Sequence, residues 1–148
     1  MARRAFVGVG RDGNGELALI SALTAALSRR EDEKTVKRAP RRGDVYFVAL
    51  DPAVGTEIRK TRPAVVISND SCNTYGSRVI VLPVTRNVDS LYPGETRIQL
   101  RGVPGRVLGD QIRSIDKSRL RSRIGVISQD ELLDVELAVQ ITLALRPS

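Results

Sequence analysis

The sequence predicts a mainly β domain, a small antiparallel barrel or sandwich that ends in a helix. Short runs rich in Val, Ile and Leu follow one another closely between residues 44 and 125, and Gly, Pro, Asn and Asp separate them. A capping sequence then opens a longer apolar segment near the C-terminus. Residues 1–40 lack the strand pattern. We therefore expect an N-terminal extension over residues 1–40 and a domain over residues 41–148.

The extension is expected to be partly helical or disordered. Apolar residues recur at helical spacing between Leu17 and Leu27, among good helix formers. The alternative is a secretory signal, since Arg3 and Arg4 precede this apolar segment. Charged residues stand too close to the segment, however, and no small-x-small cleavage site follows it. A short appended helix, or a start codon assigned too far upstream, is therefore the favoured interpretation.

The first half of the domain contains three strand signals. Residues 44–50 (DVYFVAL) are rich in β-branched and aromatic residues and end at an Asp-Pro turn signal. A polar loop leads to the apolar run of residues 63–68, and a second polar loop leads to residues 78–85. Pro83 cannot donate a backbone hydrogen bond, so it predicts an edge strand or a bulge.

The second half is expected to contain three more strands, at residues 96–100, 109–115 and 119–125. The final segment, residues 135–145, alternates apolar and polar residues, which is typical of a strand. Yet residues 128–131 form a capping box whose acidic residues suit a helix N-terminus, and the run that follows is long for a strand. We therefore expect a C-terminal helix.

The charge distribution indicates a polyanionic partner. The 148 residues carry a formal net charge of +7. Between Arg41 and Arg123 there are fifteen basic and eight acidic residues, whereas Val126–Leu145 contains four acidic residues and no basic one. A basic surface of this kind suits a nucleic acid or an acidic protein. Aromatic residues make up 3% of the chain, too few for an extensive base-stacking platform.

Several kinds of catalytic and metal site are excluded by composition. The chain has no histidine, which removes imidazole catalysis and Cys/His zinc sites. No carboxylate cluster typical of a metal site appears, so neither a metal nor another cofactor is expected. The single cysteine, Cys72, cannot form an intramolecular disulfide, so we expect a reducing compartment, the cytoplasm. No apolar run approaches the roughly 18 residues that span a bilayer.

One short stretch, TRPAVVIS at residues 61–68, raises the question of function. Pro63 fixes its own backbone and disfavours the helical conformation for Arg62. The guanidinium group is therefore presented from an extended, rigid backbone at the start of a core strand. Such an arginine suits either a structural salt bridge or a phosphate group held at a fixed place.

An ordered series of motifs resembles the MazF/PemK toxins, the toxin component of type II toxin–antitoxin pairs. The series runs from RRGDVYFVALDPAVGTEIRKTRPAVVISND through VIVLPVT and YPGETRIQL to GDQIRSIDKSRL and a final helix. The match covers about residues 41–145. Each motif is short, but five of them in the right order and spacing are specific. Residues 1–40 depart from the pattern, because such toxins usually begin near Arg41.

The resemblance implies a fold, an activity and partners. The fold would be an SH3-like β-barrel of the CcdB/PemK type, assembled as a homodimer. The activity would be sequence-specific, metal-independent cleavage of single-stranded RNA by an endoribonuclease, which leaves a 2′,3′-cyclic phosphate and a 5′-hydroxyl and inhibits translation and growth. A MazE-like antitoxin would bind the same surface through an acidic, disordered C-terminal segment.

The same resemblance assigns the site residues. The arginine of the family's RP motif falls on Arg62 and the threonine of its PVT motif falls on Thr85, and these two are the family's catalytic pair. The acidic residue of the preceding loop falls on Glu57, a candidate general base. The other predicted positions shape the site or contact RNA: Arg59, Lys60, Arg86, Asp110, Gln111 and Arg113.

The chemistry of RNA cleavage fits these residue types. Attack of a 2′-hydroxyl on the adjacent phosphorus adds negative charge to the phosphoryl oxygens, and two parallel N–H donors of Arg62 can stabilise it. Thr85 offers a hydroxyl donor to the same oxygens if a bulge places it beside Arg62. Glu57 lies on a loop that we expect to order over bound RNA.

Two other function classes remain open. A CcdB-like toxin would bind DNA gyrase without catalysis, but that group lacks the combination of Arg-Pro and Pro-Val-Thr. An SH3-like interaction module would need an aromatic groove for Pro-rich ligands, and this chain has few aromatic residues. Arg119, Arg121 and Arg123 alternate along an expected strand. For them a solvated face and contact with the RNA backbone are both open.

Overall fold

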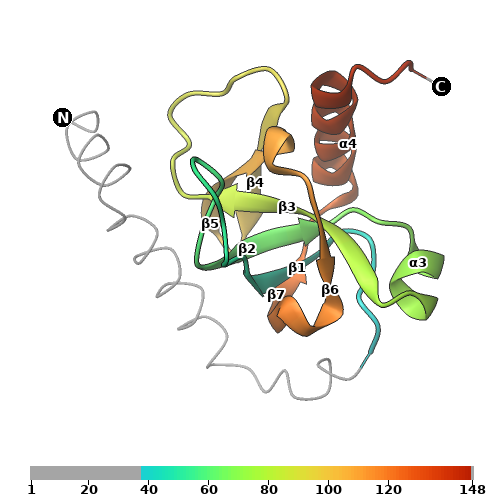
Figure 1. Cartoon of the computed structure of the whole chain (residues 1–148). Helices are drawn as coiled ribbons and strands as arrows, with labels where there is room; N and C mark the ends of the chain where they lie inside the picture. The colour runs from blue at the N-terminus through green and yellow to red at the C-terminus, as the bar shows by residue number, and fades with distance from the viewer. Residues whose placement is uncertain (1–37, 148) are drawn as a thin grey trace.

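The computed structural model describes residues 38–147 and contains a strongly curved antiparallel sheet with a helix packed against it (Figure 1). In chain order the elements are β1 (Asp44–Ala49), β2 (Thr61–Val66), α3 (Asp70–Tyr75), β3 (Arg78–Thr85), β4 (Glu95–Leu100), β5 (Val103–Leu108), the 3₁₀ turn η2 (Gly109–Gln111), β6 (Arg113–Asp116), the 3₁₀ turn η3 (Lys117–Arg119), β7 (Leu120–Val126) and α4 (Gln129–Leu143). The predicted mainly β fold with a C-terminal helix is confirmed. The helix predicted between Leu17 and Leu27 lies outside the described residues.

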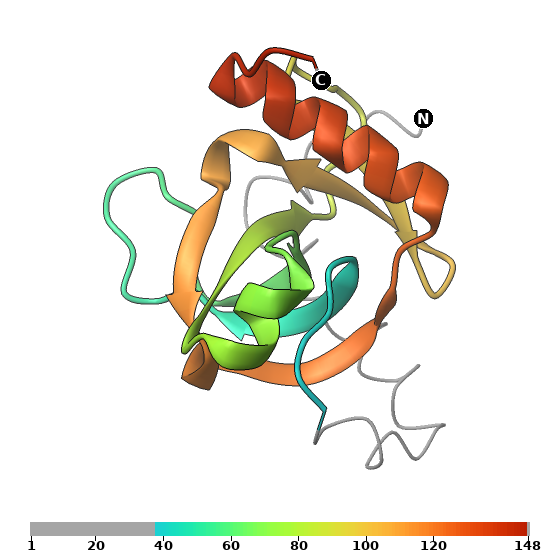
Figure 2. The ribbon, with the colours of Figure 1, turned by 90° about the vertical axis from the view of Figure 1, so that its right-hand side faces the viewer.

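The strands follow the order β4-β5-β3-β2-β1-β7, and β6 pairs with β3 off this path. Figure 2 shows the sheet curling round, with α4 lying across one side and the loop between β1 and β2 projecting from another. The curvature places this loop, residues 50–60, beside the segment that contains η2 and β6. The loop and that segment together form one wall of the site described below.

Alternate residues of β1 pack into two separate cores. Val45 and Phe47 belong to a first core cluster, shared with β2, β3, β4, β5, β7 and Val135 of α4. Tyr46 and Val48 belong to a second core cluster, shared with β2, β3 and β6. Because both faces of β1 are buried, its sequence after Asp44 is a run of apolar and aromatic residues and lacks the alternation of a half-exposed strand. Each buried side chain of this size contributes about 1.5–3 kcal/mol to folding.

The central strand β3 changes partner at Pro83. Its first half pairs with β6 as far as Val81, and its last two residues, Val84 and Thr85, pair with β5. Along its other edge, β3 pairs with β2 as far as Pro83. The edge strand or bulge predicted at this position is replaced by an exchange of partners. Pro83, which lacks an N–H, lies between the end of the ladder with β6 and the start of the ladder with β5.

Strand β4 confirms the strand predicted at residues 96–100, whereas β5, its partner in a hairpin, was not predicted. Arg101 and Gly102 connect the two strands with φ of 49° and 80°, the left-handed conformation of a two-residue hairpin turn. The sequence did not predict β5 because Pro104 and Gly105 both weaken a strand pattern. Gly105 is needed here, since a Cβ atom at this position would lie 2.5 Å from Val84 Cγ1.

The strand predicted at residues 109–115 is wrong over its first half, where the chain forms η2. The amide of Gly109 donates a hydrogen bond to the carbonyl of Gly94 (3.0 Å), and a Cβ atom on Gly109 would lie 2.2 Å from that oxygen. The same atom would lie 2.6 Å from Thr142 Oγ1 of α4. This close approach ends the extended chain and holds η2 against α4.

The capping box predicted for α4 is confirmed. Ser128 Oγ accepts from the Glu131 amide (3.1 Å), and Glu131 Oε2 accepts from the Ser128 amide (2.9 Å). Glu131 Oε1 also accepts from the Gln99 amide (2.7 Å), so the cap joins α4 to β4. A cap of this kind contributes about 1 kcal/mol. Neither α4 nor another helix in the described part of the chain is long and apolar enough to cross a membrane.

Helix α3 occupies a segment that the sequence predicted as a polar loop. Asn69 caps it, because Asn69 Oδ1 accepts from the Cys72 amide (2.8 Å). The buried side chain of Asn73 donates to the Ser68 carbonyl (2.8 Å) and anchors the helix to the end of β2. A helix of six residues is too short to show a helical period in the sequence.

A buried carboxylate joins the start of the domain to its last strand. Asp44 is 1% exposed and accepts hydrogen bonds from Arg38 (2.9 and 3.1 Å), from the Arg41 amide (2.9 Å) and from Arg123 (3.2 Å). A buried charge is tolerated when it is paired in this way. Arg123 is therefore engaged by a buried carboxylate. The expectation that Arg119, Arg121 and Arg123 share one strand face also fails for Arg119, which lies in η3.

Candidate active site

The register of the sheet indicates how Arg62 and Thr85 lie relative to each other. The last paired residues of β2 and β3 are Ala64 and Pro83. Continuing this antiparallel register by two residues places Thr85 opposite Arg62, where side chains of neighbouring strands lie about 4.5–5.5 Å apart at Cβ. Both residues follow the alternation of the second core cluster, since Ala64 of β2 and Val81 of β3 belong to it. Arg62 and Thr85 therefore lie on the same face of the sheet, at its rim.

The backbone around Arg62 is held on both sides. Pro63 pairs with Phe47 and Arg62 with Val48 across the β1–β2 ladder, so the strand continues through the Arg-Pro pair. Arg62 Nε donates to the carbonyl of Arg59 (2.7 Å), which directs the half-buried side chain back toward the loop. The extended, fixed presentation predicted for this guanidinium group is what the structure has.

The loop of residues 50–60 leads into Arg62 at this end of the sheet. Its two ends are joined by a hydrogen bond from the Leu50 amide to the Lys60 carbonyl (2.9 Å). Lys60 has φ of 66°, a left-handed conformation that costs a non-glycine residue about 1 kcal/mol. Backbone strain of this kind is concentrated at functional sites, and here it turns the chain directly before Thr61 and Arg62.

Glu57, the candidate base, is exposed within this loop. Glu57 Oε2 accepts from the Val54 amide (3.1 Å), and the Glu57 amide donates to the Val54 carbonyl (3.2 Å). The carboxylate thus stabilises the fold of its own loop, and its role as a base stays a prediction. Arg59 is likewise exposed, with Nη2 donating to the Gly55 carbonyl (3.0 Å).

A cavity of about 380 Å³ separates this loop from η2 and the start of β6. The residues that line it are Glu57, Ile58, Asp110, Gln111, Ile112 and Arg113. Four of these six belong to the predicted site, although they come from two distant parts of the sequence. Gln111 Oε1 accepts from the Ile58 amide (3.3 Å), which links the two walls.

Two arginines outside the predicted site adjoin this region. Arg106 was missed by the sequence prediction, and for Arg119 a solvated face and contact with RNA were both left open. Arg106 pairs directly with Thr85, and its Nη1 donates to the Ser90 carbonyl (2.7 Å). Its Nε is buried and has no hydrogen-bond partner among the residues that the structure describes. Arg119 donates to the carbonyls of Ala49 (3.0 Å) and Asp51 (2.6 Å). Recognising β5 in the sequence would have placed Arg106 next to Thr85.

The loop of residues 86–95 begins directly after Thr85, and two arginines hold its first part. Arg97 donates to the Val88 carbonyl through Nε (3.0 Å) and Nη2 (2.8 Å), beside the bond from Arg106. The predicted RNA contact Arg86 is half-buried at the start of this loop. The loops of residues 50–60 and 86–95 therefore flank Arg62 and Thr85 from two sides.

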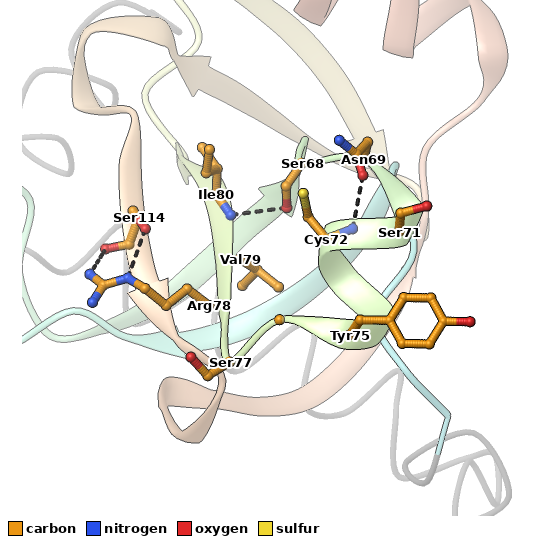
Figure 3. Close-up of a pocket in the computed structure, with 11 residues that line it drawn as sticks. Ser68, Asn69, Ser71, Cys72, Tyr75, Ser77, Arg78, Val79, Ile80 and Ser114 are labelled. Atoms are coloured by element: carbon orange, nitrogen blue, oxygen red, sulfur yellow. Dashed lines mark hydrogen bonds between the residues drawn. The ribbon is translucent and has the colours of Figure 1, made fainter.

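A second, larger hollow of about 780 Å³ lies at the opposite end of β2 and β3, between α3, the start of β3 and Ser114 of β6 (Figure 3). Figure 3 shows the Arg78 guanidinium turned toward Ser114, whose Oγ accepts from Arg78 Nε (3.0 Å), and the ring of Tyr75 pointing outward. None of the predicted site residues lines this hollow. The residues suited to phosphate chemistry gather at the other end of the sheet.

The chain is similar to known proteins in sequence and in fold. Residues 41–143 match the family model of the PemK-like, MazF-like toxins of type II toxin–antitoxin systems. The endoribonuclease MazF9 of Mycobacterium tuberculosis is 38% identical over 114 residues, which cover 71% of this chain and 97% of that protein.

Solved structures show the same architecture. The crystal structure of MazF (Form-I) from Deinococcus radiodurans superposes with a TM-score of 0.66 at 29% identity, over 73% of this chain and 99% of that one. The MazE–MazF complex (Form-II) from the same organism gives a TM-score of 0.61 at 25% identity, over 74% of this chain and 100% of that one. With the family match spanning nearly the whole described domain, this chain belongs to the PemK/MazF family of toxins of type II toxin–antitoxin systems.

Proposed function

We propose that this chain is the toxin of a type II toxin–antitoxin pair and acts in the cytoplasm as a sequence-specific, metal-independent endoribonuclease on single-stranded RNA. The domain of residues 41–148 carries the activity, and residues 1–40 are an extension to it. The name of its relative MazF9 as an endoribonuclease supports the reaction class. The observation that carries the proposal is the register of β2 and β3, which ends at the pair Ala64–Pro83 and, continued by two residues, sets Arg62 opposite Thr85.

In the proposed reaction, the 2′-oxygen of a ribose bonds to the adjacent phosphorus and the bond from phosphorus to the 5′-oxygen breaks. The products are a 2′,3′-cyclic phosphate and a 5′-hydroxyl, so one proton leaves the 2′-oxygen and one reaches the 5′-oxygen. Arg62 stabilises the charge that develops on the phosphoryl oxygens with two N–H donors. Thr85 adds a hydroxyl donor from the facing strand, and Glu57 is the candidate base.

RNA recognition is assigned to the rim of the same face. Arg59, Lys60 and Arg86 lie on the two loops that flank the catalytic pair and supply positive charge for phosphates. Asp110 and Gln111 line the adjoining cavity and offer acceptors and donors for unstacked base edges. Arg113 lines the same cavity, but its guanidinium group donates to the carbonyls of the loop.

The proposed partners are an antitoxin and a second copy of the chain. Complexes of MazE with MazF are known from Deinococcus radiodurans. A basic groove for RNA also suits an acidic, disordered segment of an antitoxin, which would inhibit by competition. Dimerisation is supported by an exposed apolar stripe on α4, where Leu133, Leu137 and Ile141 are 61%, 54% and 51% exposed.

The test is cleavage of a long, defined single-stranded RNA in EDTA, with the fragment ends identified by mass spectrometry. Wild type, Arg62→Ala and Arg78→Ala are compared. Arg78 is the matched control, because it is an exposed arginine at the far end of β3. We expect discrete fragments with cyclic phosphate ends from wild type and Arg78→Ala, and about 100- to 1000-fold slower cleavage by Arg62→Ala.

Two outcomes would contradict the proposal. Equal cleavage by wild type and Arg62→Ala would remove Arg62 from the chemistry. Absence of cleavage by wild type, together with binding to DNA gyrase, would favour the non-enzymatic class of toxin.

A further inference from the structure

The loop of residues 50–60 is held at its start by two arginines from one short segment. Arg119 Nη1 donates to the carbonyls of Ala49 (3.0 Å) and Asp51 (2.6 Å). Arg113 donates to the carbonyls that follow each of these in the chain, that of Leu50 through Nη1 (2.7 Å) and that of Pro52 through Nη2 (3.4 Å). Four successive carbonyls, residues 49–52, are therefore bound by two guanidinium groups.

These bonds begin where the sheet ends. The ladder between β1 and β7 stops at Val48 and Leu120, and Arg119 is the residue directly before Leu120. Its guanidinium group thus continues the hydrogen bonding of β1 beyond the last strand pair. Arg113 stands at the start of β6, paired with Val81, and reaches the same stretch from the neighbouring strand.

The same segment also holds the far part of the loop. Gln111 Oε1 accepts from the Ile58 amide (3.3 Å), and the Leu50 amide donates to the Lys60 carbonyl (2.9 Å). The chain from residue 111 to residue 119 therefore contacts the loop before and after Glu57. Directly beyond Lys60 the chain enters β2 and Arg62.

We propose that Arg113 and Arg119 are positioning residues, which set the loop of residues 50–60 over the Arg62–Thr85 site through its backbone carbonyls and do not contact RNA. Hydrogen bonds from a charged donor are about twice as strong as neutral ones, and the planar guanidinium fork can bridge two acceptors. A lysine keeps the charge but has no such fork. The catalytic consequence rests on the proposed function, whereas the conformation of the loop can be measured without RNA.

The first measurement is amide hydrogen exchange in the full chain without RNA. Arg113→Lys, Arg119→Lys and the double variant are compared with wild type and with Arg78→Lys, an exposed arginine that donates to Ser114 of β6 at the other end of β3. We expect the amides of Leu50 and Ile58 to exchange at least about tenfold faster in the three variants. The amides of β2 and β3 should keep the wild-type rate, and Arg78→Lys should resemble wild type throughout.

The second measurement separates positioning from RNA contact. Each arginine is replaced by Lys and by Ala, and two quantities are recorded: kcat, and the salt dependence of the Kd for an RNA whose reactive 2′-hydroxyl is replaced by hydrogen. A positioning role predicts that Lys and Ala lower kcat alike, by about tenfold or more, with an unchanged salt slope. A phosphate contact predicts that Lys resembles wild type and that Ala lowers the slope by about 0.7.

Wild-type exchange at Leu50 and Ile58 in the single variants would overturn the proposal. So would full activity in the Lys variants combined with a reduced salt slope in the Ala variants. If the double variant unfolds, the single variants give the answer. If wild type cleaves no RNA, the proposed function fails and the exchange experiment still decides whether the two arginines hold the loop.

Discussion

At the scale of single residues, the arginines of this protein differ in what their guanidinium groups contact. Arg106, Arg113 and Arg119 donate to backbone carbonyls, and Arg123 pairs with the buried Asp44. The excess of basic residues between residues 41 and 123 therefore includes charges that are engaged inside the fold. Arg59 and Lys60 of the loop of residues 50–60 are exposed at the site, and Arg86 is half-buried.

The hydroxyl of Thr85 is expected to matter for catalysis and not for folding. Thr85→Val keeps the shape of a half-buried strand residue but removes the donor, so we expect kcat to fall about 100-fold. Thr85→Ser retains the hydroxyl and should stay within about tenfold of wild type. Single-turnover cleavage of one defined RNA at saturating enzyme measures both rates. Cleavage by Thr85→Val at the wild-type rate would show that the hydroxyl takes no part.

The candidate site could be predicted only in part from the sequence. Arg62 and Thr85 stand in recognisable motifs, but their proximity depends on the register of β2 and β3, which the sequence does not display. Arg106 was missed, and the role of Arg119 was left open, because both donate to backbone carbonyls, which look alike at every position of a chain. An arginine that binds a loop and one that binds a phosphate have the same sequence signal.

At the scale of the elements, η2 depends on the absence of a side chain at Gly109. In Gly109→Ala the new Cβ would meet the Gly94 carbonyl at 2.2 Å and Thr142 Oγ1 at 2.6 Å, so η2 has to move away from α4. We expect a loss of about 1–3 kcal/mol in the free energy of unfolding, together with weaker RNA binding, because Asp110 and Gln111 move with η2.

Urea denaturation and a binding titration measure the two effects, and Gly125→Ala serves as the control. A Cβ atom at Gly125 would have no neighbour within 4 Å in the described part of the chain, so this variant should match wild type. Equal stability of the two alanine variants would mean that the contact of η2 with α4 is not tight.

The elements that were predicted correctly carry their signal in local sequence. The strands β1 and β3 consist mostly of consecutive apolar residues, and Ser128 and Glu131 form the capping box that predicts the start of α4. The missed elements depend on distant contacts or are very short. β5 contains Pro104 and Gly105, and η2 forms because Gly109 meets Gly94 and α4. Such close approaches belong to tertiary structure and leave only an isolated glycine in the sequence.

At the scale of the whole molecule, stability is expected to decline at high pH because of Tyr46. This phenol is 5% exposed, and its burial, followed by the nearby charge of Asp44, raises its pKa above the ordinary value of about 10. The neutral phenol is therefore favoured in the folded state. Its contribution to stability is fully present below pH of about 10 and is lost as the pH rises through the higher, folded-state pKa.

Denaturant unfolding across this pH range, followed with the ultraviolet absorbance of phenolate, measures the decline. In Tyr46→Phe the part of the decline that comes from this phenol should disappear. The phenolate absorbance that appears at the highest pH should disappear with it. An unchanged pH profile in Tyr46→Phe would assign the loss of stability to other groups.

The partners of Asp44 bear on where the folding unit starts. The match to the family begins at residue 41, whereas Arg38 and the buried Pro40 lie before it. A fragment that starts at Arg41 would keep every family motif and still deprive a buried carboxylate of one of its two guanidinium partners. A segment that begins at residue 41 is thus long enough to match the family, but it is too short to supply all the partners of its own buried carboxylate.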